Sequence, residues 1–237
     1  MNQQKRRRLI KVRRTGIGLI FVMAISMVAG MTDAIGLIMA GDFVSFMSGN
    51  TTRAAIAIGE GDWSGAFILL GAVGCFILGN TLGVVIASRF RKRLAGLLGI
   101  VALVLCLSAL LPLEMRGSSG FYLVVLAMGM INATVEHIEG LPIGLTYVTG
   151  ALSRFGRGIG RWLTGDRRGD WLFQVVPWIG MIVGAVIGSL LTLRIGQDAI
   201  WFVAGGCGAV SAFALWVPNR WQARYIAPSG SPVPRRK

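Results

Sequence analysis

Polar groups that could bind a solute stand beside the apolar runs of this chain. Residues 30–34 read GMTDA and place an acid, Asp33, inside an apolar run. A charge there costs free energy in a bilayer, so such a residue usually faces a cavity or a partner. A polar, glycine-containing motif follows a few residues later, formed by Ser48, Gly49, Asn50 and Thr51. Where a helix begins or breaks within such a motif, its N–H groups suit an anion and its carbonyls suit a cation. The pattern predicts a small-solute site.

The same arrangement occurs a second time. Residues 129–133 read GMINA and put Asn132 where the first copy has Asp33, and Thr149 and Gly150 then match Ser48 and Gly49. One half would offer a titratable or cation-binding group, and the other half a neutral hydrogen-bonding group. Two copies in a very apolar chain predict a membrane protein built from two related halves, with its site where the halves meet.

Plainer interpretations exist for each motif. Asp33 could simply end the first span near the outer headgroups, and residues 48–52 could form an ordinary turn, since Gly-Asn is a common turn dipeptide. Arg53 and Arg154 end the two motif-bearing segments. Arg53 could neutralise Asp33, bind an anionic substrate or contact lipid phosphate, or it could only determine topology at a helix end. For Arg154, which lies in a basic loop, we favour the topological role.

The composition places these motifs in a membrane. The chain has 237 residues, of which 54% are hydrophobic and 14% charged, whereas a soluble domain carries roughly a quarter charged residues. A helix needs about 20 residues to cross the hydrocarbon core. Six apolar runs approach or reach that length: 17–32, 64–88, 94–113, 117–135, 171–193 and 199–217. We therefore expect an all-α polytopic protein with a basic cytoplasmic arm (1–16), two membrane repeats (17–114 and 115–218) and a disordered cytoplasmic tail (219–237).

Two further segments, 43–60 and 141–153, are interrupted by polar residues, glycine or proline, and we interpret them as broken or re-entrant elements. With six full spans and a cytoplasmic N-terminus, all but three of the 24 lysines and arginines fall on the cytoplasmic side. The three exceptions are Arg53, Arg116 and Arg194. Eight spans would move the basic residues 89–93 outside, so six are favoured. Three spans per half make the second repeat inverted, related to the first by an axis in the membrane plane.

The net charge of +14 lies in short runs between these spans. Such runs indicate anionic lipid headgroups at the cytoplasmic face as partners rather than nucleic acid. Glycines in the second span (Gly71, Gly79 and Gly83) resemble a ladder in the fifth (Gly180, Gly184 and Gly188). Aligning Gly71 with Gly180 pairs Gly79 with Gly188. Small residues at this spacing pack helices closely, and they also allow a homo-oligomer.

Enzyme motifs are missing from the sequence. The chain has one histidine, and it has no H-E-x-x-H, no G-x-S-x-G and no G-x-x-x-x-G-K-[ST]. The three cysteines lie inside apolar runs without metal-ligand spacing. We therefore expect no enzymatic activity, no metal and no cofactor.

Residues 30–36 (GMTDAIG) and 42–52 (DFVSFMSGNTT) resemble the YoaK-like bacterial membrane proteins, whose pattern is roughly G-x-x-D-A followed by F-V-x-x-M-T-G-N-T. Residues 147–152 (YVTGAL) are similar to the second-half element of that family, and Ser48 keeps the hydroxyl of its usual threonine. The resemblance implies a multi-pass protein of the bacterial inner membrane, in a family of unknown function. The residues themselves favour a small-solute transporter or permease. A non-transporting scaffold or accessory subunit, with glycine ladders that serve assembly, is the alternative.

Overall fold

The computed structural model describes residues 3–133, 137–138, 141–142, 148–167, 169–219 and 221. The helices are α1 (Gln3–Ala40), α2 (Met47–Glu60), α3 (Trp63–Arg89), α4 (Arg93–Leu110), α5 (Leu113–Met115), α6 (Phe121–Asn132), α7 (Val148–Leu163), α8 (Val176–Ile195) and α9 (Ala199–Trp216). A π-helical turn, η1 (Arg116–Gly120), and two 3-10 turns, η2 (Asp170–Val175) and η3 (Gly196–Asp198), join some of them. Two short strands, β1 (His137–Ile138) and β2 (Leu141–Pro142), pair antiparallel. Most of the predicted tail, and residues 143–147 of the second broken element, lie outside the described residues.

The predicted apolar runs are helical. Four stretches of the described residues are long and apolar enough to cross a membrane: Gln4–Ala40, Trp63–Arg89, Arg93–Leu110 and Trp171–Trp216. The last stretch is divided into two helices, α8 and α9, because the chain turns at Gly196. The φ of this residue is +60°, which favours glycine. The predicted run 117–135 is divided into the η1 turn and the 12-residue α6. The fold is therefore that of a helical membrane protein.

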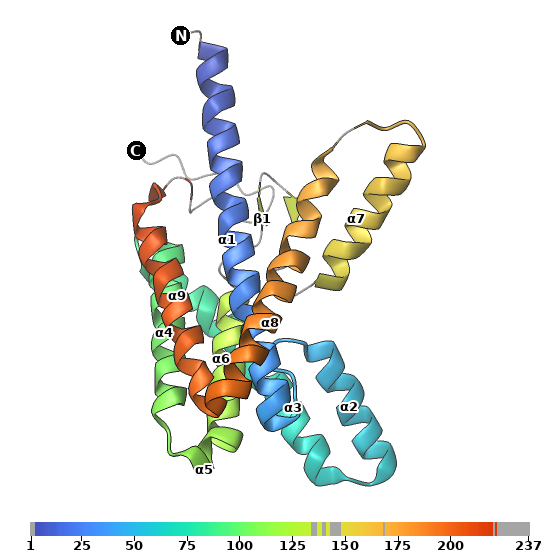
Figure 1. Cartoon of the computed structure of the whole chain (residues 1–237), viewed down its shortest axis with the longest axis vertical. Coiled ribbons are helices and arrows are strands. Elements are labelled where there is room, and N and C mark those ends of the chain that lie inside the picture. The colour runs from blue at the N-terminus through green and yellow to red at the C-terminus, as the bar shows by residue number, and fades with distance from the viewer. Residues whose placement is uncertain are drawn as a thin grey trace.

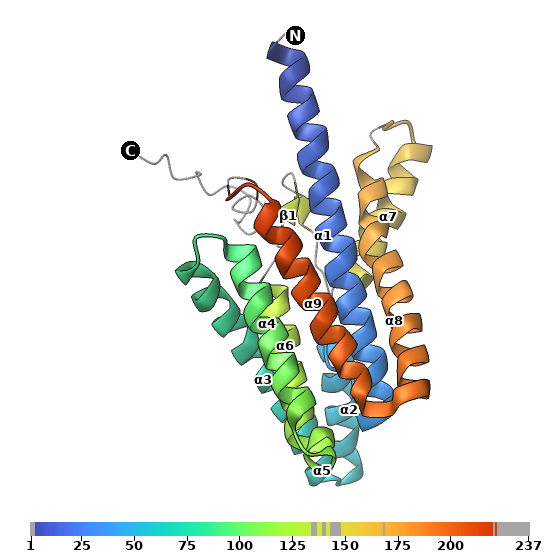
Figure 2. The ribbon, with the colours of Figure 1, turned by 60° about the vertical axis from the view of Figure 1, so that its left-hand side comes forward.

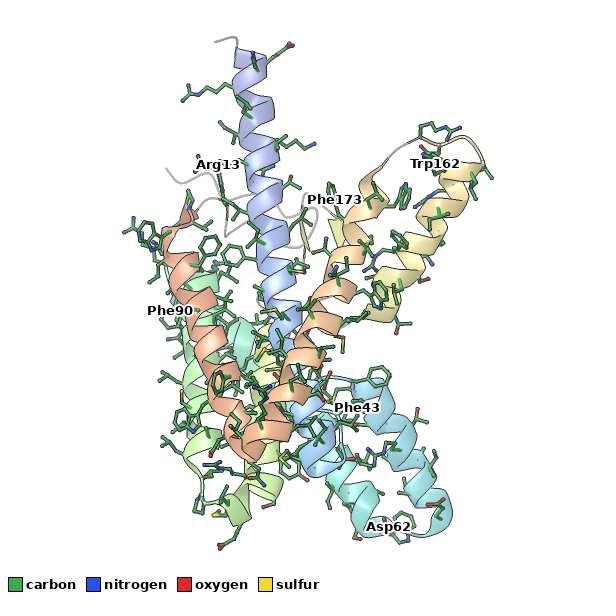
Figure 3. The ribbon with its side chains drawn as sticks, viewed as in Figure 1. Arg13, Phe43, Asp62, Phe90, Trp162 and Phe173 are labelled. Carbon is green, nitrogen blue, oxygen red and sulfur yellow. The ribbon has the colours of Figure 1, made fainter. Side chains whose placement is uncertain are left out.

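The long helices stand side by side, and their main pairings are α1 with α8, α3 with α6, and α4 with α9. Figures 1 and 2 show this elongated bundle from two sides. The short helices α2 and α7 pack beside it, α2 against α3 and α7 against η2 and α8. In Figure 3, Arg13 and Trp162 lie toward the end of the molecule opposite Asp62, and Phe90 lies nearer the middle. Basic segments from distant parts of the sequence thus lie toward one end.

Glycines allow two of these pairs to approach closely. A Cβ added at Gly30 or at Gly184 would lie inside 3.0 Å of backbone atoms across the α1–α8 interface, a distance that real Cβ atoms essentially never show. The same holds at Gly129 and Gly79 across the α6–α3 interface. Close backbone approach at small residues is a common way for helices to pack in lipid.

The contacts change the predicted register between the glycine ladders. Gly30 faces Met181 on α8, and its motif counterpart Gly129 faces Phe76 on α3. This equivalence pairs Gly184 with Gly79, whereas the sequence alignment paired Gly188 with Gly79. The register set by these contacts thus differs from the predicted one by one helical turn. Ladders with a four-residue repeat match nearly as well after a shift of four, so the sequence alone did not distinguish the two registers.

The turn between α2 and α3 offers a local test of the fold. Asp62 is the N-cap of α3: its carboxylate accepts hydrogen bonds from the Gly65 amide (3.0 Å) and the Ser64 hydroxyl (2.8 Å). These bonds, the Gly65 bond first, lower the pKa of Asp62 below its usual value of 3.8. We expect Asp62→Ala to lower the Tm in detergent by about 2–4 °C, while Asp62→Asn, which can also cap, stays close to wild type.

The pH dependence of this effect follows from the direction of the pKa shift. A carboxyl whose pKa is lower in the folded state stabilises the fold at pH values above its unfolded pKa. That contribution is lost as the pH falls through the folded pKa. The Tm difference between Asp62→Ala and wild type should therefore be full near neutral pH and shrink in acid. A difference that is independent of pH would contradict the assigned carboxylate cap.

Candidate functional site

Asp33 holds the segment that connects α1 to α2. Its side chain is only 5% exposed. One carboxylate oxygen accepts hydrogen bonds from the Val44 amide (3.0 Å) and the Ser45 amide (2.8 Å), and the other accepts one from the Ser45 hydroxyl (2.5 Å). The carboxylate is thus paired with backbone and hydroxyl donors rather than with a cation. Ser45 was not among the predicted site residues, although its position between two motif phenylalanines marks it as a polar exception.

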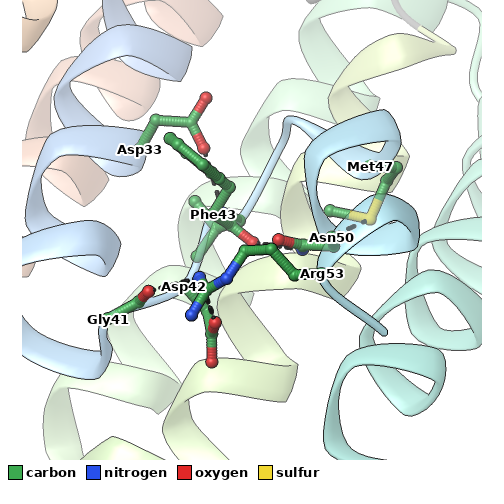
Figure 4. A network of polar contacts seen from close by, with 8 residues as sticks. Asp33, Gly41, Asp42, Phe43, Met47, Asn50 and Arg53 are labelled. Atoms are coloured by element: carbon green, nitrogen blue, oxygen red, sulfur yellow. Dashed lines mark hydrogen bonds and ion pairs between the residues drawn. The ribbon is translucent and has the colours of Figure 1, made fainter. Parts of the chain in front are cut away.

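Asn50 is the second buried polar group of this region, with no exposed surface. Its side-chain amide donates to the Phe43 carbonyl at 2.6 Å, so it holds the same connection from the α2 side (Figure 4). Its Oδ1 is buried, and no hydrogen-bond donor from the described part of the chain contacts it. A buried acceptor without a donor is costly, and such atoms often mark a place for water or a ligand.

Arg53 does not pair with Asp33. It forms an ion pair with Asp42 at 2.5 Å and donates to the Gly41 carbonyl at 2.5 Å. Its side chain is 45% exposed, so this contact is screened by solvent. Of the interpretations considered for Arg53, neutralisation of Asp33 is therefore wrong in this structure.

The other first-half residues lie on the first turn of α2. Ser48 and Thr51 are exposed, and Gly49 is half-buried against the rings of Phe43 and Phe46. The Thr51 hydroxyl donates to the Met47 carbonyl of its own helix at 2.8 Å. No side chain caps the helix at Phe46. The positive end of the α2 dipole is therefore left without a capping oxygen from the side chain at that position.

The second-half residues lie elsewhere. Asn132 ends α6 and is half-buried, while Thr149 is exposed and Gly150 half-buried in the first turn of α7. Thr32, next to Asp33, lines a cavity together with Val124 of α6. Asn132 follows Val124 by eight residues, which is roughly 12 Å along a helix axis. Neither Asp33 nor Asn132 lines this cavity itself: Asp33 holds the α1–α2 connection, and Asn132 ends α6.

The two short helices have opposed directions. In Figure 1 both α2 and α7 begin near mid-height on the same flank of the bundle; α2 then runs downward and α7 upward. Each begins with its glycine-containing motif, at Met47 and Val148 respectively. Two helix N-termini, which carry partial positive charge, thus open toward the middle of the molecule.

A small cavity lies beside the Asp33 region. Its volume is about 50 Å³, and apolar side chains form most of its wall. The polar residues that line it are Thr32, Ser108, Arg116 and Gln197. Arg116 donates to the Ala109 and Leu111 carbonyls and pairs with Asp198 at 2.8 Å, and Oε1 of Gln197 is buried without a donor. These residues come from distant segments of the sequence. The one feature of the sequence that could have pointed to this cavity was the position of Arg116 outside the basic clusters.

Among the residues that the structure describes, no group of three or more histidine, cysteine or acidic side chains is placed to hold a metal ion. The three cysteines are free thiols. What the region offers is hydrogen-bonding groups and helix N-termini, which can bind a polar solute without covalent chemistry.

Apolar helices, small-residue interfaces and a buried polar connection within the bundle define a multi-pass helical membrane protein. The chain belongs to the DUF1275 family, described as a protein of unknown function, which matches residues 21–213. It is 51% identical over 226 residues to the UPF0700 transmembrane protein RA0705 of Rhizobium meliloti (strain 1021), across 95% of this chain and 99% of that relative. No solved structure matches the chain. The family match agrees with the resemblance to YoaK-like proteins.

Proposed function

We propose that this protein is a small-solute transporter or permease of the bacterial inner membrane, with its pathway beside α2 and α7. The observation that carries this proposal is the opposed pair of short helices, each of which begins with a glycine-containing motif near mid-height of the bundle (Figure 1). Helices that begin within the membrane direct their N–H groups toward solutes in many transporters. Irregular backbone at that depth is tolerated where it is buried in protein or lines water.

The proposed architecture has six spans in two inverted repeats. Five of the spans are α1, α3, α4, α8 and α9. The sixth is the continuous stretch formed by α5, η1 and α6. In this scheme α1 corresponds to α6 and α3 to α8, so the α1–α8 pair and the α6–α3 pair are equivalent. The matching glycine contacts of the two pairs support it.

The basic end would face the cytoplasm, in accordance with the positive-inside rule. The N-terminal arm, the α3–α4 turn and the outer end of α7 carry basic residues, including Arg13, Arg91 and Arg161. Anionic lipid headgroups at that face are the proposed partners, and nucleic acid is not. The α2–α3 turn, with Glu60 and Asp62, would face the opposite side.

The solute would pass two half-sites in series. The first comprises Asp33 with Ser48, Gly49, Asn50 and Thr51, and the second comprises Asn132 with Thr149 and Gly150. The likeness of the two motifs, which pairs Asp33 with Asn132, supports one half-site in each repeat. We propose transport rather than catalysis, because hydrogen-bonding groups and helix N-termini bind and release a solute without a nucleophile or a cofactor.

Cysteine accessibility tests the pathway. Single cysteines at Ser48, Thr51, Asn132 and Thr149, in a background without the three native cysteines, would be labelled in intact cells with a membrane-impermeant thiol reagent. We expect the cysteines at Ser48 and Thr51 to be labelled, and we expect candidate solutes to reduce this labelling. Control cysteines in loops should be labelled to the same extent with and without solute. Complete protection at all four positions would refute a water-filled pathway and favour the scaffold alternative.

Asp33→Asn tests proton or cation coupling at the first half-site. Asparagine keeps a carbonyl oxygen that can accept from the Val44 and Ser45 amides, but it cannot ionise. We therefore expect a folded protein whose solute-driven proton movement, followed with a pH dye inside proteoliposomes, falls at least tenfold. Unchanged uptake with unchanged pH dependence would exclude Asp33 as the coupling group.

A further inference from the structure

Helix α7 carries a row of arginines on one face. Arg154, Arg157 and Arg161 are separated by three and four residues, so they project from the same side of the helix. Arg157 and Arg161 are exposed, and Arg154 is half-buried. Among the residues that the structure describes, none of the three has an acidic side chain within ion-pair distance. We call these three residues the α7 basic row.

A second row on α7 is apolar and exposed. Leu152, Ile159 and Leu163 are spaced by seven and four residues and share a face, and their exposed fractions are 37%, 36% and 70%. At 100° per residue this face lies nearly opposite the α7 basic row. A helix with one basic face and one apolar face is typical of segments that lie at a membrane surface.

The face between the two rows is packed, which fixes the orientation of both. Ala151 is fully buried, the Phe155 ring meets the Trp171 ring edge-on at 5.4 Å, and the backbone of Gly158 lies against the Trp171 side chain. Arg154 donates from Nε to Oε1 of Gln174 at 2.9 Å. These contacts with η2 hold α7 so that its basic row and its apolar row both stay open.

We propose that the α7 basic row binds the headgroup phosphate of an anionic phospholipid, while Leu152, Ile159 and Leu163 on the opposite face contact the acyl chains of other bilayer lipids. Arginine donors match phosphate oxygens, and each basic residue near an anionic bilayer surface strengthens binding. Trp162, stacked by Arg167 at 4.6 Å, stands beside the row near the end of α7, where an interfacial aromatic belongs. A free inorganic anion would use the arginines alone, whereas a position of α7 at the bilayer surface, among anionic headgroups, accounts for both rows. This inference stands whether or not the protein transports a solute.

Quenching by brominated lipids tests this site directly. The protein would be reconstituted in phosphatidylcholine bilayers that contain brominated phosphatidylglycerol or, at the same mole fraction, brominated phosphatidylcholine. Subtracting the signal of a Trp162→Phe variant isolates the fluorescence of Trp162. We expect phosphatidylglycerol to quench Trp162 at a several-fold lower mole fraction than phosphatidylcholine, and high salt to weaken this preference.

Substitutions in the α7 basic row test whether its arginines cause the preference for phosphatidylglycerol. Arg157→Gln with Arg161→Gln should reduce the preference about five-fold per arginine, and the double lysine variant should retain most of it. Arg194→Gln is the matched control, because Arg194 is an exposed helical arginine outside α7. Equal quenching by both lipids, or loss of the preference on addition of inorganic phosphate but not of sodium chloride at the same ionic strength, would overturn the proposal. If the double glutamine variant fails to fold, two comparisons still test the proposal. They are the lipid preference of the wild type with and without inorganic phosphate, and the lipid preference of the double lysine variant.

Discussion

Asp33→Ala is expected to lower the Tm in detergent by about 5–20 °C. Alanine removes the acceptor for the Val44 and Ser45 amides, which are buried beside α1. A buried donor without a partner costs about 1–3 kcal/mol, so two of them cost about 2–6 kcal/mol if no water reaches them. The segment 41–46 would then detach from α1, and α2 would lose its anchor. Thermal unfolding followed by tryptophan fluorescence measures this change.

Two variants separate this effect from general damage. Asp33→Asn keeps an oxygen acceptor and should lose much less stability than Asp33→Ala. Arg53→Ala removes a neighbouring but exposed ion pair, whose contribution is about 0–1 kcal/mol. A Tm for Asp33→Ala equal to that of Arg53→Ala would show that the carboxylate does not anchor the connection. The series also makes the uptake experiment interpretable, because only a folded Asp33→Asn protein can report on coupling.

The sequence could locate Asp33 but not its partners. An acid in an apolar run is conspicuous because of its cost in a bilayer, and that signal is local. Its actual partners are two backbone amides and a serine hydroxyl. Every residue except proline carries a backbone N–H, so residue type does not identify which N–H group will donate to the Asp33 carboxylate. That choice depends on the path of residues 41–46, which a linear pattern does not contain.

The same limit applies to the rest of the candidate site. The starts of α2 and α7 follow from glycine, hydroxyl and amide residues after an apolar run, and α2 lies within the predicted segment 43–60. The predicted segment 141–153 covers only the start of α7, which continues to Leu163, so Arg154 lies in a helix and not in the expected basic loop. The cavity at Arg116 and Gln197 was not predicted, because it gathers residues from six helices and turns and from the α1–α2 connection, which only the packed bundle brings together. Similarly, Asn132 matches Asp33 by motif, yet an inverted arrangement would place equivalent residues at opposite levels, so likeness in sequence did not imply contact.

Gly184→Ala should separate α1 from α8. The added methyl would meet the Met27 backbone carbonyl, which cannot move aside as the end of a flexible side chain can. Overpacking of this kind costs about 1–3 kcal/mol, so we expect the Tm to fall by about 2–12 °C. Gly74→Ala is the matched control: it is also a helical glycine, but nothing lies within 4 Å of its added Cβ. It should be neutral or slightly stabilising, since alanine favours helix.

The partner of this substitution in the other half tests the repeat itself. If α3 corresponds to α8 in the register set by Gly30 and Gly129, then Gly79→Ala meets the Leu126 carbonyl in the same way and should destabilise to a similar extent. Because the two interfaces are separate, the two losses of stability should add in the double variant. A neutral Gly79→Ala beside a damaging Gly184→Ala would mean that the α6–α3 interface can relax where α1–α8 cannot. The close contacts would then be a property of one pair of helices, and the case for equivalent halves would rest on the motifs alone.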